Sequence, residues 1–165
     1  DGLGLIDNET FTYNLYINMG SALLAGKEFV EAARCFEEAL QIKDWDNRVK
    51  LNLANTYMYM KQHEKAREIL SELKDNAPEI KEVYYCLGLS FYETGEFQTA
   101  KEMFDLAVKK DDRAILPIIR LYETLLELND NKRIAEVKKI LIERLGSEIE
   151  LEHEVERSRK TRASN

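Results

Sequence analysis

Residues 81–108 read KEVYYCLGLSFYETGEFQTAKEMFDLAV. In their first half, apolar residues recur at the i, i+3, i+4 and i+7 spacing of one helix face, at Tyr84, Leu87, Gly88 and Phe91. Glu93-Thr94-Gly95 interrupts this pattern, and a second stripe follows at Phe97, Ala100, Phe104 and Ala107. The stretch therefore predicts two α-helices joined by a short turn.

The same pair of stripes recurs upstream at a period of 34 residues. Small residues repeat in the first helix at Gly20, Ala54 and Gly88, and in the second helix at Ala32, Ala66 and Ala100. Two antiparallel helices approach closely where one of them presents no bulky side chain. A single pair cannot bury both of its stripes, so the period predicts stacked helix pairs at about 13–46, 47–80 and 81–114.

Residues 115–146 are predicted to form a fourth, divergent pair, because the stripe of the first helix continues while the pattern of the second helix is lost. Pro117 suits the first turn of a helix, where its missing N–H is harmless. Asn129-Asp130-Asn131 has the composition of a turn. Gly146 is expected to end this pair.

A last helix is expected at 147–160, where Ser147 and Glu150 form a capping box. Repeat arrays need a polar terminal element that shields the last exposed core face, and we expect this helix to act as that cap. The whole chain, 1–165, is then expected to form a single domain.

Leu-Gly followed by an aromatic residue, then Ala-x-x-x-Phe, at a 34-residue period resembles the tetratricopeptide repeat. The second unit departs from the pattern at Ala54, Leu70 and Leu73, but it retains the closing proline, Pro78. The resemblance implies an all-α, right-handed superhelix (an α-solenoid) of stacked antiparallel helix pairs, with the first helices lining a concave groove. It also implies an adaptor or scaffold that binds another protein and has no catalysis of its own.

Composition agrees with this reading. The 165 residues include only 7 Gly and 2 Pro, too few for the turns of a many-stranded sandwich or barrel. A net charge of −7 disfavours a general nucleic-acid binder. No stretch reaches the roughly 20 apolar residues of a membrane helix. We expect no signal peptide, because the first residues lack a basic segment followed by an apolar one. Two cysteines are too few for a disulfide framework, so we expect a cytoplasmic protein.

No residue pattern indicates catalysis, a metal site or a cofactor. His63 and His153 are far apart in the chain, and His63 falls in a predicted turn. We interpret Cys86 as a buried small hydrophobe and not as a nucleophile. Trp45, between the first two repeats, is expected to cover the edge of the core and not to anchor a ligand.

The face of the first helices that points away from the second helices is unusually rich in Asn and Tyr. Asn side chains both donate and accept hydrogen bonds to a peptide backbone, and Tyr is enriched at interfaces. The alternative is that these residues pack between successive first helices. We predict that this face binds a partner peptide or helix through Asn14, Asn18, Ser21, Arg48, Asn52, Asn55, Met58, Tyr59, Tyr85, Leu89, Tyr92 and Arg120; Glu82 and Leu116 lie on the same side.

Some members of the family bind the C-terminal carboxylate of chaperones through Lys, Arg and Asn. The corresponding positions in this chain hold Ile17, Ser21, Asn52, Glu82 and Cys86. Only Asn52 matches, and Glu82 would repel a carboxylate. The sequence therefore favours an apolar or helical ligand.

Three other functions stay open. The chain could self-assemble through a last-repeat face of Ile134, Val137 and Leu141 or through a displaced C-terminal helix. It could also be the regulatory domain of a larger protein. Nucleic-acid binding through Arg157, Arg159, Lys160 and Arg162 is disfavoured, because basic side chains at the end of a helix are commonly exposed to solvent without a ligand.

Overall fold

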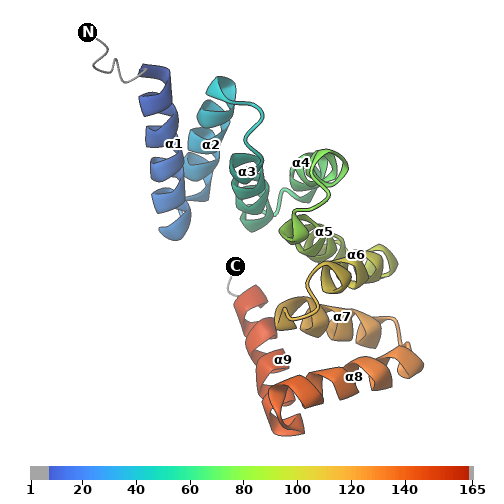
Figure 1. The fold of residues 1–165 in the computed structure, drawn as a ribbon. Helices are drawn as coiled ribbons and strands as arrows, with labels where there is room; N and C mark the ends of the chain where they lie inside the picture. Colours follow the sequence, from blue (N-terminus) through green and yellow to red (C-terminus); the bar gives the residue numbers. More distant parts are fainter. Residues whose placement is uncertain (1–7, 164–165) are drawn as a thin grey trace. The chain divides into compact units, whose positions relative to one another are not determined.

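The computed structural model describes residues 8–163, which form nine α-helices and no β-strand (Figure 1). The predicted all-α fold is therefore confirmed. The helices are α1 (Asn8–Ala25), α2 (Phe29–Ile42), α3 (Asn47–Tyr59), α4 (His63–Asn76), α5 (Lys81–Glu93), α6 (Phe97–Lys110), α7 (Ile115–Glu127), α8 (Asn131–Leu145) and α9 (Glu148–Ala163).

The helices divide into two compact units, with the boundary between Pro78 and Glu79. Unit 1 contains α1 to α4, in which α1 packs on α2, α2 on α3 and α3 on α4. Unit 2 contains α5 to α9; α5 to α8 pack consecutively, and α9 packs on both α7 and α8. Within each unit, helix pairs stack on one another as the repeat period predicts.

The turn inside every pair has the same backbone geometry. Lys27, Lys61, Gly95 and Asn129 lie 34 residues apart, and each has a positive φ, between 54° and 80°. The amide of the following residue donates to a carbonyl five residues back, as in Glu28 N to Leu23 O at 2.9 Å. This bond pattern ends a helix and reverses the chain within a few residues.

Two glycines allow the closest approach inside the pairs. A Cβ on Gly20 would lie 2.8 Å from the ring of Phe36, and one on Gly88 would lie 2.6 Å from the ring of Phe104. The second pair holds Ala54 and Leu70 at these positions, both fully buried. The smaller Leu side chain leaves room for the methyl group of alanine, so each pair reaches a dense contact with its own combination of sizes.

Asp46 starts α3 and joins it to α1. Its carboxylate accepts hydrogen bonds from the amides of Arg48 (2.9 Å) and Val49 (3.2 Å) and from the hydroxyl of Tyr13. Burial opposes ionisation of Asp46, but these hydrogen bonds outweigh it and hold the pKa below its ordinary value. Burial and the bond to Asp46 raise the pKa of Tyr13 to about 12.

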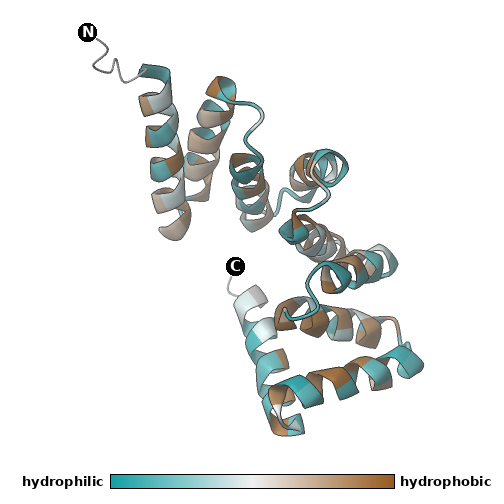
Figure 2. Cartoon of the chain, in the orientation of Figure 1, coloured by the Kyte–Doolittle hydropathy of each residue, from teal (hydrophilic) through white to brown (hydrophobic). Residues whose placement is uncertain are grey.

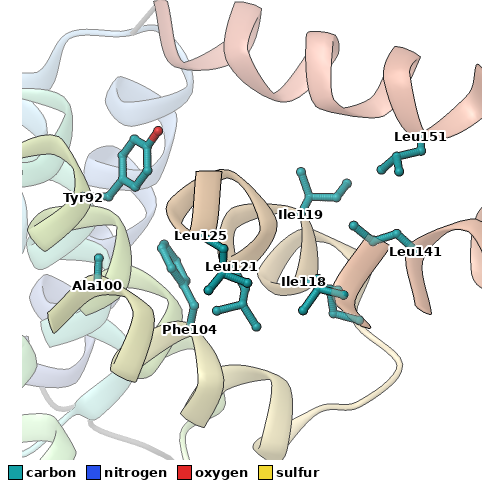
Figure 3. Close-up of a cluster of buried hydrophobic side chains, with 10 residues drawn as sticks. Tyr92, Ala100, Phe104, Ile118, Ile119, Leu121, Leu125, Leu141 and Leu151 are labelled. Carbon is teal, nitrogen blue, oxygen red and sulfur yellow. The ribbon is translucent and has the colours of Figure 1, made fainter. Parts of the chain in front are cut away.

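The core of unit 2 is a continuous cluster of apolar side chains from α5 to α9 (Figure 3). Phe104 of α6 lies beside Leu121 of α7, and Leu151 of α9 lies near Leu141 of α8. Val137 and Leu141 are buried in this cluster, so they do not form the exposed last-repeat face that the self-assembly alternative requires.

The end of α8 and the start of α9 are each marked by a local feature of the chain. Gly146 has φ 97° and ends α8, and the Glu150 amide donates to Ser147 Oγ at 3.1 Å. Trp45 differs from expectation: it is 69% exposed in the α2–α3 turn, so it does not cover the core edge.

The size match inside the pairs predicts the effect of Gly88→Ala. The added methyl group overlaps the Phe104 ring, so we expect a loss of about 1–3 kcal/mol in the free energy of unfolding. Adding Phe104→Leu recreates the combination of the second pair and should recover most of this loss. Urea denaturation of both single variants and the double variant measures the coupling.

Phe104→Leu alone should also destabilise, because it leaves a gap beside glycine. The loss of unfolding free energy in the double variant must then be smaller than the sum of the losses in the two single variants. Strict additivity would show that the ring and the glycine are not matched.

Candidate protein-binding surface

In unit 1 the predicted groove residues of α1 and α3 are mostly polar and include one charged residue, Arg48. Asn14, Asn18, Ser21 and Arg48 are exposed, whereas Asn52, Asn55 and Met58 are half-buried. The amide groups are therefore available in part to a peptide backbone, as donors and acceptors.

Tyr59, at the end of α3, is partly exposed and stacks face to face on Phe29 of α2. The ring centroids are 5.1 Å apart and the planes differ by 9°. This contact fixes the ring and leaves part of its surface open. A rigid, half-exposed tyrosine offers contact area to a ligand at low entropic cost.

Unit 2 contains a hollow of about 360 Å³ where α5, α6 and α7 meet. Its apolar part is contributed by α5, the end of α6 and the start of α7, and charged side chains lie around it. The lining residues are Lys81, Glu82, Tyr85, Ala107, Asp111, Ala114, Ile115, Leu116 and Pro117. The structure thus brings together the predicted residues Tyr85, Glu82 and Leu116.

Charged groups at the hollow are arranged around one ion pair. Lys81 Nζ lies 2.5 Å from the Asp111 carboxylate, which raises the pKa of Lys81 and lowers the pKa of Asp111. Glu82 is exposed beside them. With Lys81 and Asp111 neutralising each other, Glu82 leaves the rim with a net negative charge.

Tyr85 gives the hollow an aromatic wall. Its ring packs at a tilt against Phe104, with centroids 6.0 Å apart. Burial raises the pKa of Tyr85, while the neighbouring Arg120 guanidinium acts in the opposite direction. Leu89, one turn further along α5, is half-buried.

Two predicted groove residues are buried: Tyr92 is 9% exposed and Arg120 is 6% exposed. Tyr92 belongs to the core cluster; its ring meets Phe97 edge-on at 5.2 Å, and its hydroxyl donates to Glu127 at 3.3 Å. Arg120 lies under α9. Tyr92 contacts the second helix α6, away from which the predicted face points, and Arg120 is covered by α9.

Arg120 is part of a buried polar cluster between α7 and α9. Its guanidinium donates to Glu123 Oε2 at 2.8 Å and to the Ser158 carbonyl at 3.3 Å. Glu123 also receives the Ser158 hydroxyl at 3.4 Å, and Arg159 lies 3.4 Å from its other oxygen. These contacts fix α9, which is predominantly hydrophilic, on the face of α7 that carries the predicted groove residues (Figure 2).

The sequence did not indicate Ala107, Asp111 and Ala114 as site residues. They lie at the end of α6 and in the connection to α7, outside the first helices on which the groove prediction was based. The 34-residue period could have located them, because the end of each second helix falls beside the start of the next first helix.

Both cysteine thiols are free and buried. Burial, together with Glu82, raises the pKa of the Cys86 thiol to about 12, so it is protonated at neutral pH and suits the predicted packing role. Among the described residues, no three His, Cys, Asp or Glu side chains gather where they could hold a metal ion.

The basic residues at the end of α9 lie beside carboxylates. Arg157 pairs with Glu154, and Lys160 Nζ lies 2.7 Å from Glu156. Arg159 faces the buried Glu123. Arg162 lies beyond the described side chains. Arg157, Arg159 and Lys160 therefore each have a carboxylate partner within the chain.

Stacked helix pairs that repeat every 34 residues define the class of α-helical repeat proteins. Residues 23–85 match the sequence model of the tetratricopeptide repeat family. The match covers 63 of the 165 residues, and it agrees with the resemblance that the sequence pattern indicates.

The BBSome complex member BBS4 from Bos taurus is 27% identical to the chain over 122 residues, which is 73% of the chain and 23% of that protein. The chain therefore spans about a quarter of the length of this curated relative.

Solved structures of tetratricopeptide repeat proteins share the fold. MamA from Desulfovibrio magneticus RS-1 has a TM-score of 0.75 at 22% identity, over 80% of this chain and 75% of that one. The first tetratricopeptide repeat domain of Spaghetti has a TM-score of 0.68 at 13% identity, over 72% and 94%. In the described part of the chain, no helix is long and apolar enough to cross a bilayer.

The buried ion pair between Arg120 and Glu123 predicts that replacing Glu123 lowers the stability of the fold. Glu123→Ala leaves the Arg120 guanidinium uncompensated beneath α9, so we expect a loss of about 3–5 kcal/mol in the free energy of unfolding. Replacing both partners, as Arg120→Met with Glu123→Leu, should recover most of it. Urea denaturation monitored by circular dichroism measures both effects.

Glu136→Ala is the matched control, because Glu136 pairs with Arg133 at 3.7 Å on the surface of α8. We expect it to change stability by less than about 1 kcal/mol. Equal losses for the Glu123 and Glu136 variants would contradict a buried role for the pair.

Proposed function

We propose that the chain is a protein-interaction module, an adaptor or scaffold, that binds a segment of a partner protein at the hollow of unit 2. The observation that carries this proposal is an open hollow of about 360 Å³ with apolar walls and a charged rim. Concave apolar sites with a few polar groups are the usual form of binding sites. Leu116 is 54% exposed at this hollow, which makes it available to a ligand.

The lining favours a segment with one large apolar side chain. The small side chains of Ala107 and Ala114 leave room in the hollow for a ligand side chain, and Tyr85 and Leu116 offer apolar surface for it to contact. The negative rim at Glu82 favours a basic residue beside that anchor. An amphipathic helix or an extended peptide with an apolar residue next to Lys or Arg has this chemistry.

The same residues disfavour an acidic peptide. The structure of Spaghetti that shares the fold is bound to the HSP90 peptide SRMEEVD. In the present chain, two of the positions that would supply the clamp hold buried Ile17 and Cys86, and Glu82 carries a negative charge. The peptide-bound structure of Spaghetti supports peptide binding as the mode of interaction, and BBS4 is named as a member of a complex. The negative rim of the hollow, however, favours a ligand other than an acidic peptide.

Leu116→Glu tests the site. The side chain is largely exposed, so the fold should be retained, while a carboxylate in the hollow should weaken binding of an apolar anchor by at least about tenfold. Proteins that bind the immobilised wild-type chain are identified by mass spectrometry. The affinity of a binding segment from one of them is then measured by fluorescence anisotropy.

Ile140→Glu is the matched control: Ile140 is 41% exposed on α8 and does not line the hollow. It should leave both the affinity and the melting temperature close to wild type. If Leu116→Glu binds every segment as tightly as Ile140→Glu does, the hollow is not the binding site.

A further inference from the structure

The fourth helix pair lacks the contact that brings the helices of the other pairs together. In each of the first three pairs, a small residue of the first helix faces a large apolar residue of the second helix. The facing residues are Gly20 and Phe36, Ala54 and Leu70, and Gly88 and Phe104. One period further along the chain, the same two positions hold Tyr122 of α7 and Lys138 of α8. The large residue is thus on the first helix, and the second helix carries a flexible, charged side chain.

A hollow of about 320 Å³ lies at this place, between α7, α8 and α9. Tyr122 and Lys138 both line it, and its apolar walls are completed by Leu126 of α7 and by Leu151 and Val155 of α9. In the other pairs the residue equivalent to Lys138 is fully buried. The repeat period therefore identifies this hollow with a space that a large apolar side chain fills elsewhere in the chain.

Lys138 does not replace that apolar side chain, because its charged end stays at the surface. The side chain keeps 38% of its surface exposed, and its ammonium group pairs with Glu148 at the start of α9. The hydrogen bond to Glu148 raises the pKa of Lys138. A lysine commonly lays its stem along apolar surface while its charge remains in water. The apolar walls beside Tyr122 are then left without a ring that would cover them.

The side of the hollow that belongs to α9 is acidic. Glu148, Glu152 and Glu156 follow one another at four-residue spacing, so they share one side of the helix, and all three line the hollow. Glu148 pairs with Lys138, and Glu156 lies 2.7 Å from Lys160 Nζ. Two of the three carboxylates are therefore matched by a cation of the chain.

Arg159 is the other cation in the lining of this hollow. Its guanidinium lies 3.4 Å from the buried carboxylate of Glu123, so its charge is directed toward α7. With these ion pairs formed, the hollow keeps the negative charge of Glu152, which is exposed. A negative charge at the edge of an apolar hollow favours a ligand that carries a positive charge next to its apolar part.

We propose that the hollow between α7, α8 and α9 is a second ligand-binding site, which takes a phenylalanine or leucine side chain of a partner peptide with Lys or Arg beside it. The apolar side chain would fill the space that Phe104 fills in the third pair. The basic neighbour would approach Glu152. This site shares no lining residue with the hollow between α5, α6 and α7, so it can bind a ligand whether or not that hollow does.

The test uses three tripeptides as probes, each acetylated and amidated: Lys-Phe-Lys, Glu-Phe-Glu and Lys-Ala-Lys. The 165-residue chain, with isotope-labelled Ile, Leu and Val methyl groups, is titrated with each peptide and followed by NMR. The methyl groups of Leu126, Leu151 and Val155 report on the hollow between α7, α8 and α9. Those of Ile115 and Leu116 report on the hollow between α5, α6 and α7, so the two sites are followed separately.

Lys-Phe-Lys should shift the methyl signals of Leu126, Leu151 and Val155 in a saturable way. Lys-Ala-Lys should bind at least about tenfold more weakly, because the apolar side chain is lost. Glu-Phe-Glu should bind at least about threefold more weakly, because its carboxylates meet Glu152. Equal affinities for the three peptides would overturn the proposal, and so would shifts confined to Ile115 and Leu116, which would leave binding at the other hollow intact.

Lys138→Phe places in α8 the residue that α2 and α6 have at this position. The ring should fill the hollow, so the shifts of Leu126, Leu151 and Val155 on addition of Lys-Phe-Lys should disappear. The melting temperature, followed by circular dichroism, shows that the variant is folded. A folded variant that still binds Lys-Phe-Lys as tightly as the wild-type chain would contradict a site in this hollow.

Glu152→Lys tests the charge without filling the hollow, and the fold should be retained because Glu152 is exposed. It should weaken binding of Lys-Phe-Lys by at least about threefold and strengthen binding of Glu-Phe-Glu. Glu102→Lys is the matched control, because Glu102 is exposed on α6 and does not line the hollow. It should leave both affinities unchanged, and equal effects of the two substitutions would overturn the role of Glu152.

Discussion

The fold depends on a contact inside each of the first three helix pairs, between a small residue on the first helix and a large one on the second. At Gly20 and Gly88 the phenylalanine ring lies so close that a Cβ would overlap it. This contact sets the distance between the two helices, and therefore the width of the pair. Pairs of equal width can stack at a constant period. In the second pair Ala54 replaces the glycine and Leu70 replaces the phenylalanine, so the gain in size on one helix is offset by the loss on the other.

A second constraint makes the pairs interchangeable in register. Each turn ends its first helix at a residue in the left-handed region, and these residues lie 34 positions apart although they are Lys, Lys, Gly and Asn. The backbone hydrogen bonds of the turn, and not the glycine alone, hold this conformation. Because every first helix ends at the same point of the 34-residue period, side chains at equivalent repeat positions lie on the same side of their own helix.

Direction could therefore be predicted from the sequence, whereas exposure could not. The period located the helices and the close contact at Gly88, and local sequence signals located the end of α8 at Gly146 and the cap at Ser147. It treats all first helices alike, but burial depends on what lies next to each one. Arg120 faces the predicted side and is buried because α9 covers it, and Met19 has the position of a core residue but is exposed because no second helix precedes α1 in the described chain.

The position of α9 also explains why the hollow lies where it does. On α7, α9 covers the later part of the groove face, where Ile119 and Glu123 are fully buried. Leu116 lies about one turn earlier in the helix, and it stays exposed. The groove face of unit 2 is thus closed at one end by a polar cluster and left open at the other, beside Tyr85 and the end of α6. A cap fixed by hydrogen bonds to Arg120 and Glu123 restricts access to this one region, which is why binding at the groove face of unit 2 is expected to centre on the start of α7.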